Sequence, residues 1–487
     1  MNPDTAEMAI VDPASERSAP FEPSAAGLLP RSRARILAKL RSADAAQITA
    51  VREVWRALWS SRLLVWAAGG GTVLAFGFGP VRNAFNPPGV TRGFGWLGDL
   101  LAAPAARWDG AWYLVIAHYG YRPDLGAFTS SRTAFFPLYP LGLSAISRLG
   151  VPPVLAGVLL SVSALACALY GIHRLTTLEL ARAGAHQNPV RRKDPAGRED
   201  PADRGEVARL AVMVTAFAPM AFFFSAVYSE SLYLALSVGV FLCARQGRWA
   251  WVGVLGALAA ATRSAGVVLL LGAVMLYLYG PREDRAPDFL APARWRPAYR
   301  LRRDVLWLGL MPAGLGIYMA YLALSGGDAL MPFHAQDVWG RHFAGPYGGI
   351  WDGVKAAFEG ARQLLSFQRR HVYFPLAGGS PFIDAGHNLM LLAFLLAAAT
   401  AIVGVLRMLP LAYGAYVIAA LALPLSYPVA SQPLMSLPRF LVVLFPLSIW
   451  LGAWLAAHPR TRMPALAFSA VLMAAFAAQF ATWHWVA

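Results

Sequence analysis

Apolar blocks of up to about 20 residues recur along most of this 487-residue chain. About 20 apolar residues form a helix that matches the thickness of a bilayer's hydrocarbon core. Hydrophobic residues make up 57% of the chain and charged residues 14%, whereas soluble domains average about 45–50% and about 25%. The sequence therefore predicts an all-α polytopic membrane protein with about 10–12 membrane segments, some of them broken or re-entrant.

The charge of the chain is strongly positive, with a formal value of +16. Most arginines lie between apolar blocks, as the positive-inside rule describes. We therefore expect contact with anionic membrane lipid and no nucleic-acid partner. The two cysteines, Cys167 and Cys243, lie inside apolar blocks, so neither a disulfide framework nor a zinc site is expected.

The first 62 residues differ from the rest of the chain. Residues 1–30 are polar and lack an apolar core, so we expect a disordered tail and no cleavable signal peptide. Residues 31–62 carry many arginines among apolar residues and predict an amphipathic helix on the inner membrane surface. The sequence thus predicts two parts, a cytoplasmic tail with an interfacial helix (1–62) and a membrane domain (63–487).

The apolar blocks set the expected topology of a multi-pass protein of the cell membrane. A first pass from Leu63 to Val81 starts at a cytoplasmic N-terminus and leaves a long first loop, 82–133, on the extracytoplasmic face. Later blocks lie at about 134–149, 152–172, 207–226, 229–244, 249–262, 264–280, 304–325, 387–406, 409–425, 439–457 and 464–482.

Two basic segments create a conflict in this topology. The charged linker 188–206 and the basic segment 281–303 both resemble cytoplasmic loops. Two blocks, 134–149 and 152–172, separate the first loop from the linker, although an odd number of crossings is required. Either the first block is re-entrant or the linker lies outside.

A second long non-apolar stretch, 326–386, is too polar to cross the bilayer. It is rich in aromatic residues such as Trp339, which disordered segments lack. It also holds His334 and His342, hydrogen-bonding groups suited to a polyhydroxy acceptor. We expect this stretch to cover the extracytoplasmic face, where it would help to build an acceptor site or act only as a packed cap.

The first loop contains the strongest chemical signal, a carboxylate among aromatic residues. The run Arg107-Trp108-Asp109-Gly110-Ala111-Trp112-Tyr113 combines a proton acceptor with rings that can stack on a sugar. An interfacial aromatic belt with an Arg–Asp pair would give the same pattern. The following Phe135-Phe136-Pro137-Leu138-Tyr139-Pro140 is interpreted mainly as the proline-shaped start of a helix.

Three isolated charges lie in long apolar runs: Glu230, Arg263 and Arg439. Such charges are costly in a membrane and usually have a partner or a function. The arginines could pair with Glu230 or bind a phosphate, for which the planar guanidinium is well shaped. No P-loop, nucleophile elbow, zinc motif or dinucleotide fingerprint is present.

Together these motifs resemble the PIG-V family of mannosyltransferases in the GT-C superfamily, over about residues 60–460. The matching segments are RWDGAWYLVIAHYGY, FFPLYP, the run from Ala226 to Val268, and SLPRFLVVLFPL. The resemblance implies a GT-C-like helical fold. It also implies inverting transfer of mannose from a polyprenyl-phosphate donor on the extracytoplasmic face, with Asp109 as general base.

This resemblance sets the expected site and partners. We expect substrate contacts from Arg107, Trp108, Trp112 and Tyr113, and also from Glu230, Arg263 and Arg439, for which the resemblance fixes no individual role. The acceptor would be a lipid-linked or cell-surface glycan rather than a GPI precursor. No cofactor or resident metal is expected, with a divalent cation left open. The alternative is a multi-pass transporter or lipid flippase, which would also have buried charges and broken helices.

Overall fold

A computed structural model describes residues 28–79, 85–91, 95–122, 130–183, 201–289, 296–367, 380–429 and 432–486. Within these ranges the chain is helical and forms no strand, and a lone β-bridge joins Arg341 to Val429. The predicted all-α class is confirmed. The expected disordered tail and most of the 188–206 linker lie outside the described residues.

The chain divides into two compact units, Met1–Thr49 and Ala50–Ala487. Helix α1 (Leu28–Phe76) is continuous through the predicted interfacial helix and the predicted first pass. After α1, the chain continues with short helices that precede the membrane-length ones. They are α2 (Pro88–Thr91), α3 (Gly95–Ala102), η1 (Ala103–Ala106), α4 (Asp109–Tyr119), α5 (Ser130–Thr133) and α6 (Leu138–Ser147).

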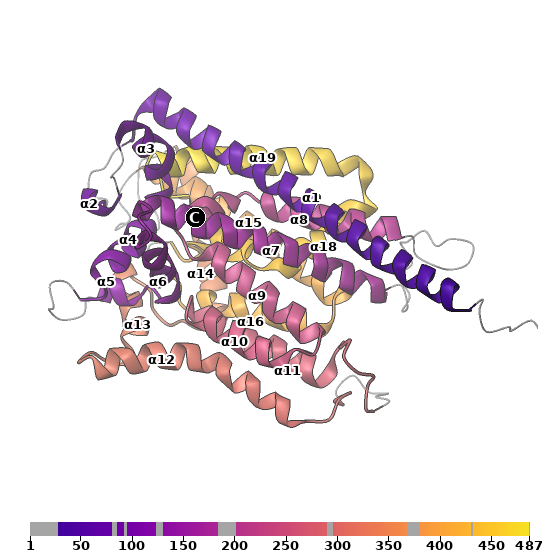
Figure 1. Ribbon diagram of the computed structural model, residues 1–487. Coiled ribbons are helices and arrows are strands. Elements are labelled where there is room, and N and C mark those ends of the chain that lie inside the picture. The colour runs from indigo at the N-terminus through magenta and orange to yellow at the C-terminus, as the bar shows by residue number, and fades with distance from the viewer. Residues whose placement is uncertain are drawn as a thin grey trace, which may run out of the picture. The chain divides into compact units, whose positions relative to one another are not determined.

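Most of the remaining helices overlap the predicted apolar blocks, whereas α13, η6 and α14 fall in the predicted non-apolar stretch 326–386 (Figure 1). The first group is α7 (Pro153–Ala183), α8 (Pro201–Ala216), η3 (Ala221–Ser225), α9 (Glu230–Arg245), α10 (Trp249–Ala260), η4 (Ser264–Gly266), α11 (Leu269–Tyr279), η5 (Arg303–Gly309) and α12 (Leu310–Leu324). The second group is α13 (Met331–His334), η6 (Ala335–Trp339), α14 (Gly345–Ser366), α15 (Pro381–Met408), α16 (Leu411–Leu425), α17 (Leu437–Val442), α18 (Phe445–Ala457) and α19 (Pro459–Ala481).

Four described helices are long and apolar enough to cross a membrane: Pro153–Leu180, Arg303–Leu324, Pro381–Met408 and Pro459–Ala481. Helix α6 has only 10 residues, about 15 Å of helix, and cannot span a core about 30 Å thick. Of the two blocks between the first loop and the linker, only the second forms a helix long enough to cross, α7.

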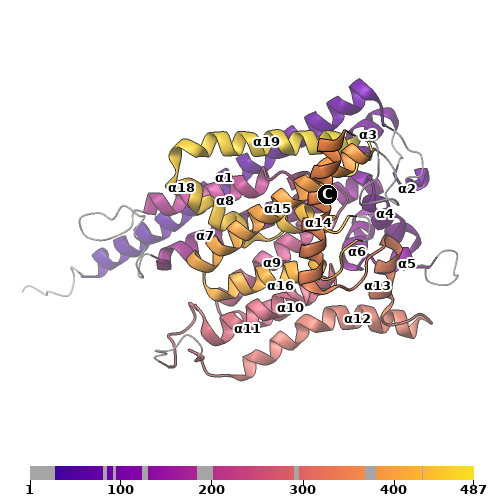
Figure 2. The same ribbon diagram turned by 180° about the vertical axis from the view of Figure 1, so that it is seen from behind.

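A buried polar cluster marks the end of the bundle at which α7 and α9 finish. Arg245, the last residue of α9, forms an ion pair with Glu179 of α7 and donates to the carbonyl of Pro281 at 3.0 Å. The hydroxyl of Tyr413, near the start of α16, donates to Glu179 at 2.6 Å. Because α9 begins at Glu230, its two termini carry two separate charged clusters at opposite ends of the bundle (Figures 1 and 2).

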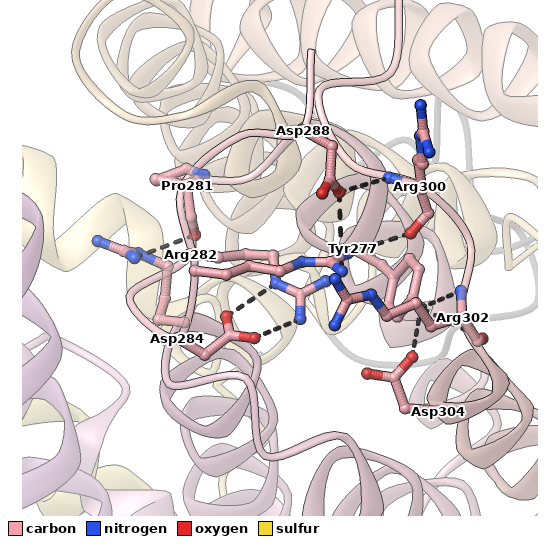
Figure 3. Close-up of polar contacts among 10 residues, drawn as sticks. Tyr277, Pro281, Arg282, Asp284, Asp288, Arg300, Arg302 and Asp304 are labelled. Atoms are coloured by element: carbon pink, nitrogen blue, oxygen red, sulfur yellow. Dashed lines mark hydrogen bonds and ion pairs between the residues drawn. The ribbon is translucent and has the colours of Figure 1, made fainter.

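The basic segment 281–303 is fastened at this same end by a network of ion pairs (Figure 3). The guanidinium of Arg282 donates to both oxygens of Asp284, at 2.9 and 2.6 Å. Burial raises the pKa of Asp284, but these hydrogen bonds and the charge of Arg282 outweigh it and leave the pKa below its usual value. The backbone N–H of Arg300 likewise lowers the pKa of Asp288. The described residues of the segment, 281–289 and 296–303, are therefore held in place by these contacts despite the surplus of positive charge.

A buried arginine satisfies the backbone where the chain is irregular between α8 and η3. Arg62 of α1 is fully buried. Its guanidinium donates to the carbonyls of Ala216 and Ala221, at 3.0 and 2.7 Å, and to the hydroxyl of Ser225 at 2.7 Å. Carbonyls freed at a helix end need such donors in a low-dielectric interior. Arg62 thus permits the helix break that precedes the Glu230 cluster.

Candidate active site

A cavity of about 260 Å³ lies at the other end of the bundle, where helices meet by their termini. Its lining includes Asp109 at the start of α4, Arg263 beside η4, and Arg439 in the first turn of α17. The last turn of α16 and the segment 332–341 complete the wall. Helix termini suit such a site because they place side chains at one end of the bundle, away from its packed middle.

Asp109 and Arg439 are joined directly, although 330 positions separate them in the sequence. Arg439 Nη1 donates to Asp109 Oδ2 at 2.7 Å. The guanidinium of Arg439 also packs over the rings of Phe223, Tyr228 and Phe440, at 5.6–5.7 Å from each centroid. No described residue donates to Asp109 Oδ1, so this oxygen can accept a proton from a ligand.

Glu230 lies behind this pair and holds both arginines with one oxygen. Arg263 Nη1 donates to Glu230 Oε1 at 3.0 Å, and Arg439 Nε lies 3.1 Å from the same atom. The Glu230 side chain is 1% exposed, and its second oxygen has no hydrogen-bond partner among the described residues. The four charges form a chain from Arg263 through Glu230 and Arg439 to Asp109. Of the two arginines, Arg439 is the one that reaches Asp109.

The backbone is strained directly before the two helices that carry Asp109 and Arg439. Trp108, which precedes Asp109, has φ 54°, and Ser436, three residues before Arg439, has φ 68°. A positive φ outside glycine costs about 1–3 kcal/mol and is concentrated at functional sites. Each strained residue directly precedes a helix, α4 or α17, so the sharp turn aims the first helical turn at the cavity.

The other predicted residues of the first loop divide into one that lines the cavity and three that do not. Tyr113 lines it, and its hydroxyl lies 2.9 Å from the Ser229 hydroxyl. Trp112 is not part of the lining; it stacks on Phe85 at a centroid distance of 3.9 Å. Of the first-loop residues predicted to contact substrate, Tyr113 therefore lines the cavity together with Asp109.

Arg107 and Trp108 are directed toward the C-terminal segment instead. Arg107 Nε donates to the carbonyl of Ala481 at 3.2 Å, and its guanidinium lies over the Trp483 ring. Trp108 packs edge-on against Trp483 and Trp485. These two residues support the turn that presents Asp109. Neither of them lines the cavity.

The FFPLYP motif contributes both a helix start and part of the cavity. Helix α6 begins at Leu138, after Pro137, as the proline pattern predicts. Phe135 and Phe136 line the cavity beside Tyr113. This motif therefore adds two aromatic side chains to the lining, whereas Trp112 adds none.

The predicted outer stretch 326–386 lies at the Asp109 end and supplies one wall of the cavity. Pro332, Phe333, Gln336, Trp339 and Arg341 line it. Neither His334, which pairs with Asp328 at 3.1 Å, nor His342 is part of the lining.

Helix α14 lies across the direction of α16 at this end of the bundle (Figure 2). Its small residues permit a close approach: a Cβ on Gly349 would lie 2.0 Å from the carbonyl oxygen of Leu425. Helix α14 is therefore packed closely against the end of α16.

Arg341 and Trp485 are two lining residues that no sequence motif pointed to. Arg341 is one of four arginines in the stretch 326–386, which otherwise attracted attention for its aromatic residues, so no isolated charge marked it. Trp485 is two positions before the last residue, beyond every recognised motif. For Trp485, the only signal in the sequence was a rare residue type, tryptophan, in a terminal segment.

Metal ligands do not gather anywhere in the described part of the chain: it contains no group of three or more His, Cys, Asp or Glu side chains that could hold a metal ion. The positive charge of the cavity is supplied by guanidinium groups. Guanidinium groups and divalent ions both stabilise phosphate charge.

The fold and cavity define a helical membrane protein with a carboxylate–arginine site at one end of its bundle. Residues 86–280 match the family model described as Mannosyltransferase (PIG-V). The resemblance found in the motifs is confirmed over this range, which contains Asp109, Glu230 and Arg263 and ends before Arg439. The match supports glycosyltransferase activity. No curated protein matches the chain.

Two solved structures are similar to the chain, both of the oligosaccharyltransferase from Archaeoglobus fulgidus. One carries a tethered acceptor peptide (TM-score 0.37), and the other is a complex of the archaeal oligosaccharyltransferase AglB with an inhibitory peptide and a dolichol-phosphate (TM-score 0.35). Each has 13% sequence identity over 88% of this chain. The chain spans only 56% of the length of those proteins.

Proposed function

We propose that this protein is a membrane mannosyltransferase that moves mannose from a polyprenyl-phosphate donor to a hydroxyl of a lipid-linked or cell-surface glycan. The observation that carries this proposal is the pairing of Asp109 with Arg439 in a cavity that also holds Arg263. One carboxylate and its neighbouring cations are the groups that an inverting sugar transfer from a phosphate needs. The family match over residues 86–280 supports the sugar and the reaction class.

The proposed chemistry is a single in-line displacement. Asp109 Oδ1 accepts the proton of the acceptor hydroxyl while the acceptor oxygen forms a bond to C1 of mannose. The bond between C1 and the phosphate oxygen breaks, and its electron pair leaves with the polyprenyl phosphate. Arginine side chains stabilise the negative charge that grows on the phosphate. A single displacement inverts the configuration at C1.

Arg439 has two effects on Asp109 in this scheme. Its hydrogen bond to Oδ2 fixes the carboxylate in one orientation, which leaves Oδ1 for the acceptor. Its positive charge also balances the negative charge of the carboxylate at the edge of the cavity. Glu230, bonded to both Arg439 and Arg263, holds the two guanidinium groups in place.

The cavity position also favours a transferase over a transporter or flippase. A transporter is expected to hold its isolated charges at the middle of the membrane, between repeated halves. Here the charges lie at helix termini at one end of the bundle and neutralise one another in pairs. A site at the extracytoplasmic end would receive a lipid-borne donor by lateral diffusion within the membrane.

Reconstituted protein distinguishes these functions. The purified full-length chain in liposomes is given polyprenyl-phosphate mannose, labelled in the sugar, and a crude glycolipid acceptor fraction. We expect labelled mannose to appear on the acceptor and free polyprenyl phosphate to accumulate. Movement of intact donor across the bilayer without cleavage would contradict the proposal and identify a flippase.

A further inference from the structure

We propose that Arg341 binds the phosphate of the polyprenyl-phosphate donor and so determines donor affinity. This inference rests on the function proposed above and adds a residue that no motif or family match indicated. The family match ends at residue 280, well before Arg341. The argument depends on which cations in the cavity already have an anionic partner.

Three arginines and two carboxylates line or back the described cavity. Arg439 is paired with Asp109 and Glu230, and Arg263 is paired with Glu230. Arg341 forms no ion pair with any described carboxylate. The cavity therefore carries one positive charge in excess, and that charge resides on Arg341.

The backbone around Arg341 is well anchored, so the position of the side chain is defined. Arg341 forms an antiparallel bridge with Val429, and Ala344 N donates to Ser426 O at 2.9 Å. Arg341 Nη1 donates to the carbonyl of Tyr427 at 2.9 Å. This single hydrogen bond to a neutral carbonyl leaves most of the guanidinium fork available for a ligand.

The surroundings of Arg341 disfavour its positive charge, which an anion bound nearby would offset. Burial and the charge of Arg439 lower the pKa of Arg341 to about 10, although the charge of Asp109 acts in the opposite direction. A phosphate between these two guanidinium groups would relieve their repulsion. It would also satisfy the planar donor fork of Arg341, which matches phosphate oxygens in a bidentate geometry.

The wall beside Arg341 favours a phosphate that carries a hydrocarbon chain. Leu423 and Pro424 of α16, together with Val443 and Leu444 after α17, form an apolar part of the lining. Tyr427, whose carbonyl binds Arg341, continues this wall. A lipid phosphate could therefore place its charge on Arg341 and its first isoprene units against α16. A free phosphate would contact only the polar part of the cavity lining.

The test compares Arg341→Gln with Arg362→Gln in the full-length protein. Arg362 is a suitable control because it lies on α14 in the same outer stretch, is exposed, pairs with Glu359, and does not line the cavity. Inhibition by sugar-free polyprenyl phosphate and by inorganic phosphate is measured with the donor KM, the acceptor KM and the melting temperature. We expect Arg341→Gln to raise the donor KM and the lipid-phosphate inhibition constant about tenfold, with acceptor KM and melting temperature unchanged.

Each outcome bears on one claim. An Arg341→Gln protein with the donor KM of Arg362→Gln overturns the inference while the transferase function stands. Wild-type protein that neither binds polyprenyl phosphate nor transfers mannose overturns the function itself. Inhibition by inorganic phosphate alone, lost in Arg341→Gln, would mean that the ligand is a free phosphate and would overturn the lipid assignment. If Arg341→Gln does not fold, Arg341→Lys keeps the charge, loses the fork, and should still weaken lipid phosphate about threefold.

Discussion

At the scale of single residues, Glu230 is the group on which the geometry of the site depends most. One of its oxygens contacts both Arg263 and Arg439, at 3.0 and 3.1 Å. A buried carboxylate between two guanidinium groups is costly to create but more costly to disrupt, because each lost partner leaves an unpaired charge. Glu230 therefore positions the arginines and does not itself line the cavity.

This arrangement predicts the effect of removing the Glu230 charge. Glu230→Gln should lower the free energy of unfolding by about 3 kcal/mol and reduce mannose transfer, because both arginines lose their shared anion. Thermal denaturation in detergent and the transfer assay measure the two effects. The double variant Glu230→Gln, Arg263→Gln should recover part of the lost stability. Equal stability of wild type and Glu230→Gln would show that the ion pairs are not formed.

The sequence indicated which isolated charges mattered but not how they were joined. Glu230, Arg263 and Arg439 stood out because lone charges in apolar runs need partners, and all three meet in one chain of contacts. The sequence could not say that Arg439 rather than Arg263 reaches Asp109, because that depends on how α17 and α4 are brought together. Arg341 was hidden for the opposite reason, since a charge among many polar residues carries no signal.

At the scale of helices, close packing depends on glycine and alanine where α10 meets α12. A Cβ on Gly314 of α12 would lie 1.9 Å from the Ala257 carbonyl oxygen. On the α10 side, a Cβ on Gly253 would lie 2.1 Å from the Trp307 carbonyl oxygen. Small residues allow helix backbones in a membrane to approach closely. The position of α10 matters for the site because Arg263 follows its C-terminus.

Gly314→Val should therefore destabilise the protein, while Gly316→Val should not. The two glycines lie on the same helix, but a Cβ on Gly316 would meet no atom within 4 Å. Overpacking at Gly314 should cost about 1–3 kcal/mol or more and should lower the melting temperature in detergent. Equal melting temperatures for the two variants would contradict the close contact between α10 and α12.

The positions of most helices could be predicted from apolar block lengths, but their continuity could not. The blocks at 152–172 and 387–406 became longer helices, α7 and α15, because helix formation does not stop where hydropathy falls. The block at 207–226 was broken at Ala216, where Arg62 from another helix satisfies the freed carbonyls. Helix α14 was not foreseen, because its sequence mixes apolar, charged and small residues and its average hydropathy is that of a polar segment.

At the scale of the whole second unit, the two charged clusters define its two ends. The Glu179–Arg245 cluster and the basic segment 281–303 lie at one end, and the Asp109 cavity lies at the other. By the positive-inside rule the first end should be cytoplasmic. The cavity should then open on the extracytoplasmic side, where donor and glycan acceptor would meet.

Cysteine labelling tests this orientation. In a protein whose Cys167 and Cys243 are replaced by alanine, single cysteines at the exposed positions Phe343 and Arg296 report the two ends. A membrane-impermeant maleimide applied to intact cells should label the Phe343→Cys protein and leave Arg296→Cys unlabelled until the membrane is opened. The reverse labelling pattern would place the cavity on the cytoplasmic side and contradict the proposed topology.

The central claim is that Asp109 takes the proton of the acceptor in a mannose transfer. The most direct test is the turnover of Asp109→Asn, whose amide keeps the shape of the side chain but cannot act as a base. Asp337→Asn is the control, because Asp337 is exposed and does not line the cavity. We predict that Asp109→Asn folds like wild type and loses mannose transfer by about 10²- to 10⁴-fold, while Asp337→Asn retains it. Wild-type turnover by folded Asp109→Asn would remove Asp109 from the mechanism and contradict the account.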